Sequence, residues 1–274
     1  MPASFRAHAA RAVLAVAAAL LATGATTADA TMAGAHAARP SPIRVDHQLC
    51  YTVAARGFRV PSAAVLLVNQ FSPKGFRPRI GAAVLHCNPA LKVLPTGGVV
   101  PITNPRAHLA CFKITAQRQP VHLVTVSNQF GHAPMTTGQP NLLCLPSWKS
   151  LTGPPRMRTA QPPGLSHFTC YPVKLPTGTV GFNPPPIQLR DQFAPRPVSV
   201  RVSRVPVELC LPTKKIVRGQ VFPMVNPVMH LLCFPVTHTP ARPRVFDQNQ
   251  FGTAVVTIGR TSMLCVPSVK HIIR

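Results

Sequence analysis

The segment SHFTCYPVK (166–174), IQLRDQF (187–193) and VELCLPTKK (207–215) contains the three motifs around which the chain is organised. His-x-x-Cys followed by an aromatic residue opens it, Asn/Asp-Gln-Phe lies at its centre, and Cys-x-Pro-x-x-Lys closes it. The same three motifs occur four times in this order, with opening cysteines about 60 residues apart at Cys50, Cys111, Cys170 and Cys233. This recurrence indicates four tandem repeats.

The repeats predict an all-β fold. The chain contains 33 prolines among 274 residues, and proline blocks helix interiors. The segment 198–203 alternates Val with Ser or Arg, which is the period of a half-buried strand. We expect about three short antiparallel strands per repeat. Pairs of repeats are expected to form two small sandwiches or barrels, and a four-bladed propeller is the alternative.

The copies alternate in type, which predicts the domain boundaries. Asn-Pro precedes the opening His of the second and fourth copies, at Asn104-Pro105 and Asn226-Pro227. Copies one and two therefore form one expected β domain (43–149), and copies three and four form another (166–274). The Pro/Gly-rich segment 150–165 between them is the expected linker.

The N-terminus has the pattern of an export signal (1–30), followed by a leader (31–42) expected to be disordered. Arg6 and Arg11 form a basic n-region, an apolar run follows over 12–22, and small residues offer cleavage after Ala30 or Ala37. No later stretch is apolar for long enough to span a membrane. We expect a secreted or cell-envelope protein.

The eight cysteines, two per repeat, are expected to form disulfides in such a compartment. Eight cysteines allow 105 pairings. If each repeat folds alike, the simplest solution joins the two cysteines of each copy. The expected pairs are Cys50–Cys87, Cys111–Cys144, Cys170–Cys210 and Cys233–Cys265.

The other recurring residues are interpreted as structural. Zinc sites usually contain closely spaced cysteine pairs, so the opening histidines are expected to support the fold, and no metal or cofactor is expected. The central motif suggests either a sugar-binding platform or a strand end, with Phe in the core and the amides bonding turn backbone; the second reading is favoured. These residues are His47, His108, His167, His230, Phe71, Phe130, Phe193 and Phe251.

Charge is the feature that points to a partner. The chain has 29 Lys and Arg against five Asp and Glu, and a net charge of +24. Such a surface attracts anionic envelope polymers or polysaccharides. Nucleic acid is not expected, because aromatic residues that stack on bases are sparse.

A non-catalytic binding module is therefore the main expectation, because the acidic residues are too few for paired-carboxylate chemistry. One alternative is a structural surface or spacer protein without a ligand. Another is a hydrolase of unknown class, which would need a cleft holding His with Asp191 or Asp247.

The motif set His-x-x-Cys-Tyr/Phe, Asp/Asn-Gln-Phe and Cys-x-Pro resembles a family of bacterial exported repeat domains of unknown function, over roughly residues 44–270. The resemblance implies secretion and a cysteine-paired, β-rich repeat, and it implies no activity. This chain departs from the pattern at His86, where other copies have Leu, and at Arg204, where they have Gly.

Overall fold

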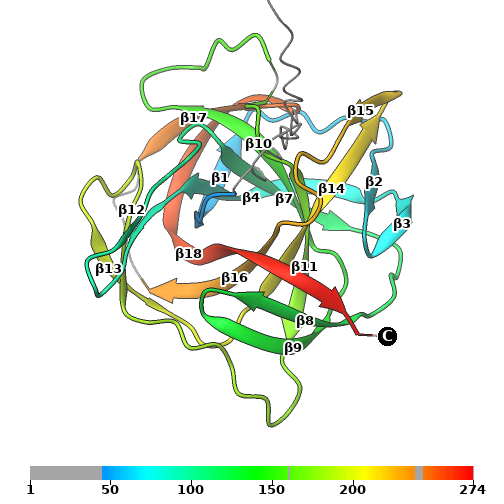
Figure 1. Cartoon of the computed structure of the whole chain (residues 1–274). Coiled ribbons are helices and arrows are strands. Elements are labelled where there is room, and N and C mark those ends of the chain that lie inside the picture. Colours follow the sequence, from blue (N-terminus) through cyan, green and yellow to red (C-terminus); the bar gives the residue numbers. More distant parts are fainter. Residues whose placement is uncertain (1–44, 160, 238–242, 274) are drawn as a thin grey trace, which may run out of the picture. The chain divides into compact units, whose positions relative to one another are not determined.

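A computed structural model describes residues 45–159, 161–237 and 243–273. These described residues contain eighteen β-strands and no helix, so the all-β expectation is confirmed (Figure 1). Among them there is consequently no helix with the length and apolarity that a membrane span requires. The expected signal (1–30) and leader (31–42) lie outside the described residues.

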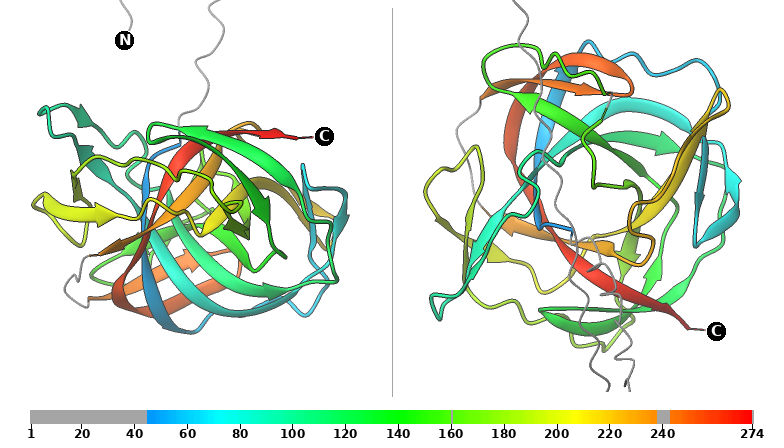
Figure 2. Two further views of the ribbon diagram at one scale, coloured as in Figure 1. Left: turned by 90° about the horizontal axis from the view of Figure 1, so that it is seen from below. Right: turned by 45° about the horizontal axis from the view of Figure 1, so that its top comes forward.

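Eight strands that carry the cysteines form one closed antiparallel ring (Figure 2). Each repeat contributes the strand of its opening motif and the strand of its closing motif. In ring order the strands are β1 (Gln48–Arg56), β4 (Arg79–Pro89), β7 (His108–Thr115), β10 (Leu142–Ser150), β11 (His167–Lys174), β14 (Glu208–Val217), β16 (His230–Thr237) and β18 (Gly252–Ile272). β18 pairs with β1 and closes the ring, so each of the eight ring strands is paired on both sides.

The pairing register between neighbouring ring strands is the same within each repeat and the same at each junction between repeats. Within the second repeat, Cys111 lies directly opposite Cys144. At the junction with the third repeat, Cys144 lies opposite Phe168, two residues before Cys170. The same two-residue offset occurs at the other three junctions. An offset of constant sign tilts the strands, and this tilt lets the sheet close on itself.

The cysteine side chains point into the ring. The four disulfides join Cys50 to Cys87, Cys111 to Cys144, Cys170 to Cys210 and Cys233 to Cys265, which are the pairs that the repeats led us to expect. Sulfurs of neighbouring repeats also approach each other, with Cys144 Sγ 3.8 Å from Cys170 Sγ. All eight cysteines belong to one buried cluster with leucines, Phe168 and Met263. Only side chains on the inner face of a closed sheet can converge in this way.

The central motifs form hairpins on the outer face of the ring. Three hairpins consist of β2 (Leu66–Asn69) and β3 (Ser72–Phe76), β8 (Leu123–Asn128) and β9 (Gly131–Thr137), and β12 (Ile187–Arg190) and β13 (Val198–Val202). In the fourth repeat, β17 (Arg244–Asn249) pairs with the first part of β18. The connectors add β5 (Leu91–Val93), β6 (Val99–Val100) and β15 (Gln220–Phe222).

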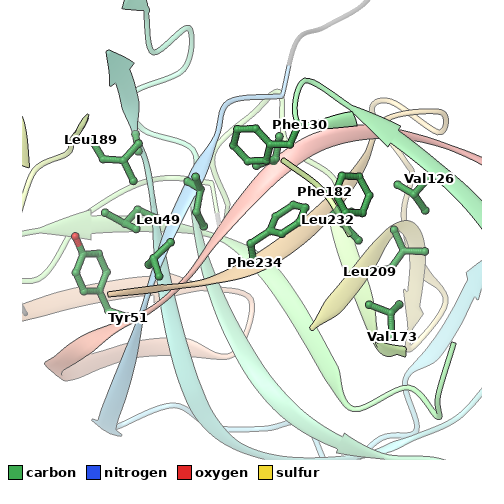
Figure 3. Close-up of a cluster of buried hydrophobic side chains, with 14 of the residues drawn as sticks. Leu49, Tyr51, Val126, Phe130, Val173, Phe182, Leu189, Leu209, Leu232 and Phe234 are labelled. Carbon is green, nitrogen blue, oxygen red and sulfur yellow. The ribbon is translucent and has the colours of Figure 1, made fainter. Parts of the chain in front are cut away.

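The hairpins cover a second core on the outside of the ring (Figure 3). Leu49, Leu209 and Leu232 of the ring strands are fully buried there against Val126 and Phe130 of the β8–β9 hairpin. The ring strands are therefore buried on both faces: all seven residues from Leu142 to Trp148 are buried. This explains why their sequence is apolar almost without alternation.

The structure corrects the expected number of strands and their grouping. Eighteen strands replace the dozen expected, because both arms of each central hairpin are strands and the connectors contain three more. β10 pairs with β11 across the expected linker 150–165, and residues 41–274 form one compact unit. The division into two sandwiches or barrels over 43–149 and 166–274 is therefore wrong, as is the propeller. Half a ring would leave two unpaired strand edges, and these edges pair with the other half.

Candidate functional site

The repeated central motif builds a turn, as expected for a strand end. The side-chain oxygen of its first residue accepts hydrogen bonds from backbone N–H groups two and three residues later. Asn69 Oδ1 accepts from Phe71 N and Ser72 N at 2.9 and 3.2 Å, and Asp191 Oδ1 accepts from Phe193 N at 2.9 Å. The other two copies form the same turn. One side-chain oxygen of the first residue thus stabilises the turn in all four copies.

The motif aromatics connect repeats that are two positions apart along the chain. The Phe of each central motif packs edge-on against the aromatic residue of an opening motif, with ring centroids 4.9–5.5 Å apart. The pairs are Tyr51–Phe193, Phe112–Phe251, Tyr171–Phe71 and Phe234–Phe130. Each hairpin therefore covers a strand of the opposite repeat, and no repeat encloses its own core.

The opening histidines and closing lysines contact the central motif of the next repeat. His47 Nε2 lies 2.6 Å from Gln129 Nε2, and Lys92 donates to Gln129 Oε1. Lys270 donates to Gln70 Oε1 at 2.7 Å, which joins the fourth repeat to the first. Burial, together with the nearby charge of Lys92, lowers the pKa of His47 to about 4. His47 is therefore neutral at pH 7.

One junction instead contains a buried polar cluster. His86 Nδ1 lies 2.8 Å from Asp247 Oδ2, and His86 Nε2 lies 2.8 Å from Asn88 Oδ1. Asn88 Nδ2 donates to Asp191 Oδ2 at 2.8 Å, and Tyr51 Oη donates to the same oxygen at 2.8 Å. Both acidic residues that we had considered for catalysis are thus brought together with a histidine.

Two further basic side chains border this cluster. His108 Nδ1 lies 3.0 Å from Asn88 Oδ1, and Lys149 Nζ donates to the same oxygen at 2.6 Å. Burial lowers the pKa of Lys149 to about 7, against the opposing effect of Asp191 and Asp247. Burial also lowers the pKa of His108, with Lys149 and His86 adding to the effect.

The cluster is a closed network. His86, Asn88, Asp191 and Asp247 are each at most 5% exposed, so a substrate has no direct access to the His86–Asp247 pair. Most of its polar groups find a partner within the network, as buried polar groups require, whereas Asp247 Oδ1 makes no hydrogen bond within the described residues. Sequence reasoning missed this cluster, although His86 in place of Leu and Asp191 in place of Asn were its signals.

Exposed charge in the described residues has a single sign. Their four acidic side chains, Asp46, Asp191, Glu208 and Asp247, are all buried, with exposed fractions of 1–8%. Every described arginine is exposed. Buried acidic groups do not offset the field at the surface as exposed ones would, so the described surface is cationic.

Three of these arginines line one groove. A cavity of about 610 Å³ is bordered by Arg106, Arg156 and Arg158 with Trp148. The Arg106 guanidinium lies 5.7 Å from the Trp148 ring centroid, and Trp148 Nε1 donates to Thr159 O at 2.9 Å. The segment 150–165 is thus bound to β10 and forms one wall. We name this feature the arginine groove.

The largest of the described cavities has a different character. It measures about 980 Å³ and lies between β12, β13, the Pro184–Pro186 segment and the β5–β6 connection. Proline and aliphatic residues form most of its wall, and Arg201 is its one charged lining residue. Among the described residues, no group of three or more His, Cys, Asp or Glu could hold a metal ion. The arginine groove is therefore a candidate site that matches the charge of the chain.

The closed ring, the four disulfides and the interlocked hairpins define a disulfide-stabilised all-β repeat protein. Residues 108–267 match a family described as a repeat of unknown function (DUF7450), and the chain belongs to this family. No curated protein and no solved structure matches the chain.

Proposed function

We propose that this protein is an exported, non-catalytic binding module for anionic polymers of the cell envelope or extracellular space. The observation that carries the proposal is the segregation of charge: every described acidic side chain is buried and every described arginine is exposed. A surface with one sign of charge attracts polyanions over distances of about a Debye length.

The arginine groove is the proposed contact site. Guanidinium groups form paired hydrogen bonds with carboxylate, sulfate and phosphate oxygens, so three of them along one groove suit a repeating anion. The ring of Trp148 holds Arg106 in place from one side. A polymer lying in the groove would contact Arg106, Arg156 and Arg158 together.

Export is supported by the N-terminal sequence pattern and by cysteine chemistry. Four disulfides persist in oxidising compartments and are rare in the cytosol. Mass spectrometry of the protein recovered from culture medium or envelope fractions tests this step. A mature N-terminus near Ala30 or Ala37 is expected, and an intact Met1 in the native protein would contradict export.

Binding is tested by retention on an immobilised acidic polysaccharide. The triple variant Arg106→Gln/Arg156→Gln/Arg158→Gln should elute at clearly lower salt than the native protein. The matched control Arg190→Gln/Arg201→Gln/Arg244→Gln removes the same charge from exposed positions elsewhere. Retention that persists unchanged at about 0.5 M salt would contradict the proposal, since screening weakens such contacts.

A spacer role without a ligand is the second candidate. The observation in its favour is that the recurring motif residues described above serve the fold: turns, ring contacts and disulfides employ them. Equal elution of both triple variants, at a salt concentration set by net charge alone, would favour this role over a specific site.

A further inference from the structure

The four closing lysines occupy equivalent positions but differ in their partners. Lys92 donates to Gln129, Lys149 donates to Asn88, and Lys270 donates to Gln70. Lys215 Nζ makes no hydrogen bond within the described residues, although its side chain is 0% exposed. A buried amine without an acceptor is costly in free energy, so this exception requires an explanation.

The equivalent glutamine makes a different set of contacts here. By analogy with Lys92 and Lys270, the acceptor would be the side chain of Gln250 in the next central motif. Gln250 Oε1 accepts from His167 Nε2 at 3.1 Å, as Gln70 Oε1 accepts from His230, but Gln250 Nε2 also donates to Gln161 Oε1. Gln161 comes from the 150–165 connector, which reaches no other junction in this way.

A cavity lies beside the unpartnered amine. It measures about 370 Å³, and its lining includes Lys215, Arg59, Arg218 and Gln220 but no acidic residue. Lys215 Nζ lies 4.7 Å from the Phe222 ring centroid and 5.1 Å from that of Phe251. Burial lowers the pKa of Lys215 to about 7, which agrees with an amine that lacks a counter-charge.

The rim of this cavity carries a strained residue. Arg218 has φ of 48° and precedes Gly219 with φ of 77°, and together they form the two-residue turn from β14 to β15. Asn or Gly is preferred at such positions, because a long side chain is strained there. The turn nevertheless places a guanidinium at the mouth of the cavity. Strained residues often occur at binding sites.

We propose that this cavity, the Lys215 pocket, binds a small oxyanion: a carboxylate, sulfate or phosphate group. One oxygen of the anion accepts from Lys215 Nζ, and Arg59 and Arg218 face its charge at the mouth. Phe222 is half-buried on the three-residue strand β15, which within the described part of the chain pairs only with β14, so its ring can move aside to admit the anion. The site is separate from the arginine groove and does not depend on the proposed function.

The test measures thermal stabilisation of the full chain by sodium sulfate, with ionic strength held constant by chloride. Ligands that bind only the folded state raise Tm in proportion to binding. We expect sulfate to raise Tm of the native protein more than that of Lys215→Met, because sulfate also stabilises folded proteins without a site through exclusion from their surface. Lys270→Met, which removes a lysine that has a partner, should keep the full increase.

Arg218→Gly provides a variant that folds without strain, because Gly suits a positive φ. It should lower the sulfate-dependent increase in Tm by half or more, whereas the exposed control Arg244→Gln should not change it. Equal increases in the native protein, Lys215→Met and Arg218→Gly would overturn the proposal.

A second arm replaces sulfate with dextran sulfate and so separates a free ion from a group on a polymer. If the increase in Tm with either reagent is smaller in Lys215→Met, the pocket is supported. The reagent that gives the increase then shows whether the anion is a free ion or a group on a polymer. An increase that depends on neither Lys215 nor Arg218 overturns the proposal. The triple arginine-groove variant should keep its response to free sulfate, so failure of the groove and failure of the pocket are distinguishable.

Discussion

At the scale of single residues, small departures from the repeat pattern decide the chemistry of each junction. Leu precedes the closing Cys in three copies, whereas His86 occupies this position in the first copy and joins Asp247 to Asn88. At another junction Gln250 bonds His167 and Gln161, and Lys215 has no acceptor within the described residues. The same backbone thus accommodates junctions whose buried polar side chains are paired and a junction at which one of them is unpaired.

His86→Leu restores the repeat pattern but should destabilise the protein by about 3–5 kcal/mol, because it leaves the buried Asp247 carboxylate without its partner. Denaturant unfolding measures the change. His86→Leu/Asp247→Asn should recover a substantial part of the loss, since it removes the unpaired charge. A single variant more stable than the native protein would contradict the role assigned to the cluster.

The buried histidines predict a pH dependence of stability. Burial lowers the pKa of His47 to about 4, of His167 to about 3 and of His230 to about 4. Between these values and about 6.5 the unfolded state binds more protons than the folded state, so the free energy of unfolding rises with pH. Burial also lowers the pKa of His108 and of His122, whereas it raises the pKa of Glu208 to about 7, which opposes this trend with one group against five.

Denaturant unfolding at a series of pH values should therefore give increasing stability from about pH 4 to 6.5. His167→Gln should reduce the slope in this range, because it removes one of the histidines whose pKa is lowered by burial. A flat or falling profile would contradict the neutral, buried state of the histidines.

At the scale of elements, each hairpin completes the core of another repeat. The hairpin of the fourth repeat places Phe251 against Phe112 of the second, at 4.9 Å between ring centroids. The pairing partner of a hairpin is thus remote in sequence. The glycines of the closing strands fit this arrangement, because a Cβ at Gly259 would lie 2.4 Å from Thr52 Oγ1 of the first repeat.

Double-mutant cycles with Ala should detect the crossing of repeats. Phe112 and Phe251 are expected to be coupled by about 0.5–1.5 kcal/mol, as edge-on aromatic pairs are. Phe112 and Phe130, which belong to the same repeat, provide the control and should be additive within about 0.5 kcal/mol. Stronger coupling within the repeat than across repeats would contradict the observed topology.

At the scale of the whole molecule, ring closure makes the four repeats interdependent. β10 meets β11 in the middle of the chain and β18 meets β1 at its two ends. Each repeat also receives a hairpin from another. This differs from a solenoid, in which a repeat contacts only its neighbours.

Neither half of the protein should unfold cooperatively by itself, when fragments 43–149 and 166–274 are expressed separately with their disulfides oxidised. Each fragment exposes two strand edges of the ring and lacks the hairpins that the other half supplies. The chain from residue 43 to residue 274 should unfold in one transition. Circular dichroism during thermal unfolding measures both. Cooperative unfolding of either isolated fragment would restore the two-domain interpretation.

Prediction from the sequence succeeded where information is local and failed where it is not. The turn at Asn69 and the disulfide between Cys50 and Cys87 depend on residues within one repeat, and both are present as expected. The predicted grouping of the repeats into two domains was wrong, because the sequence of a strand does not identify the strand with which its edge pairs. The arginine groove was missed because Arg106 and Arg158 come from different connectors.

The sequence by itself determined the class of fold, the repeat period and the cysteine pairing, because these depend on alternation and spacing along the chain. The tertiary structure alone decided which repeats meet, which charges are buried, and that Lys215 lies without an acceptor beside a cationic cavity. The physical reason is the two-residue register offset at each junction. It closes the ring and brings together side chains that no local pattern connects.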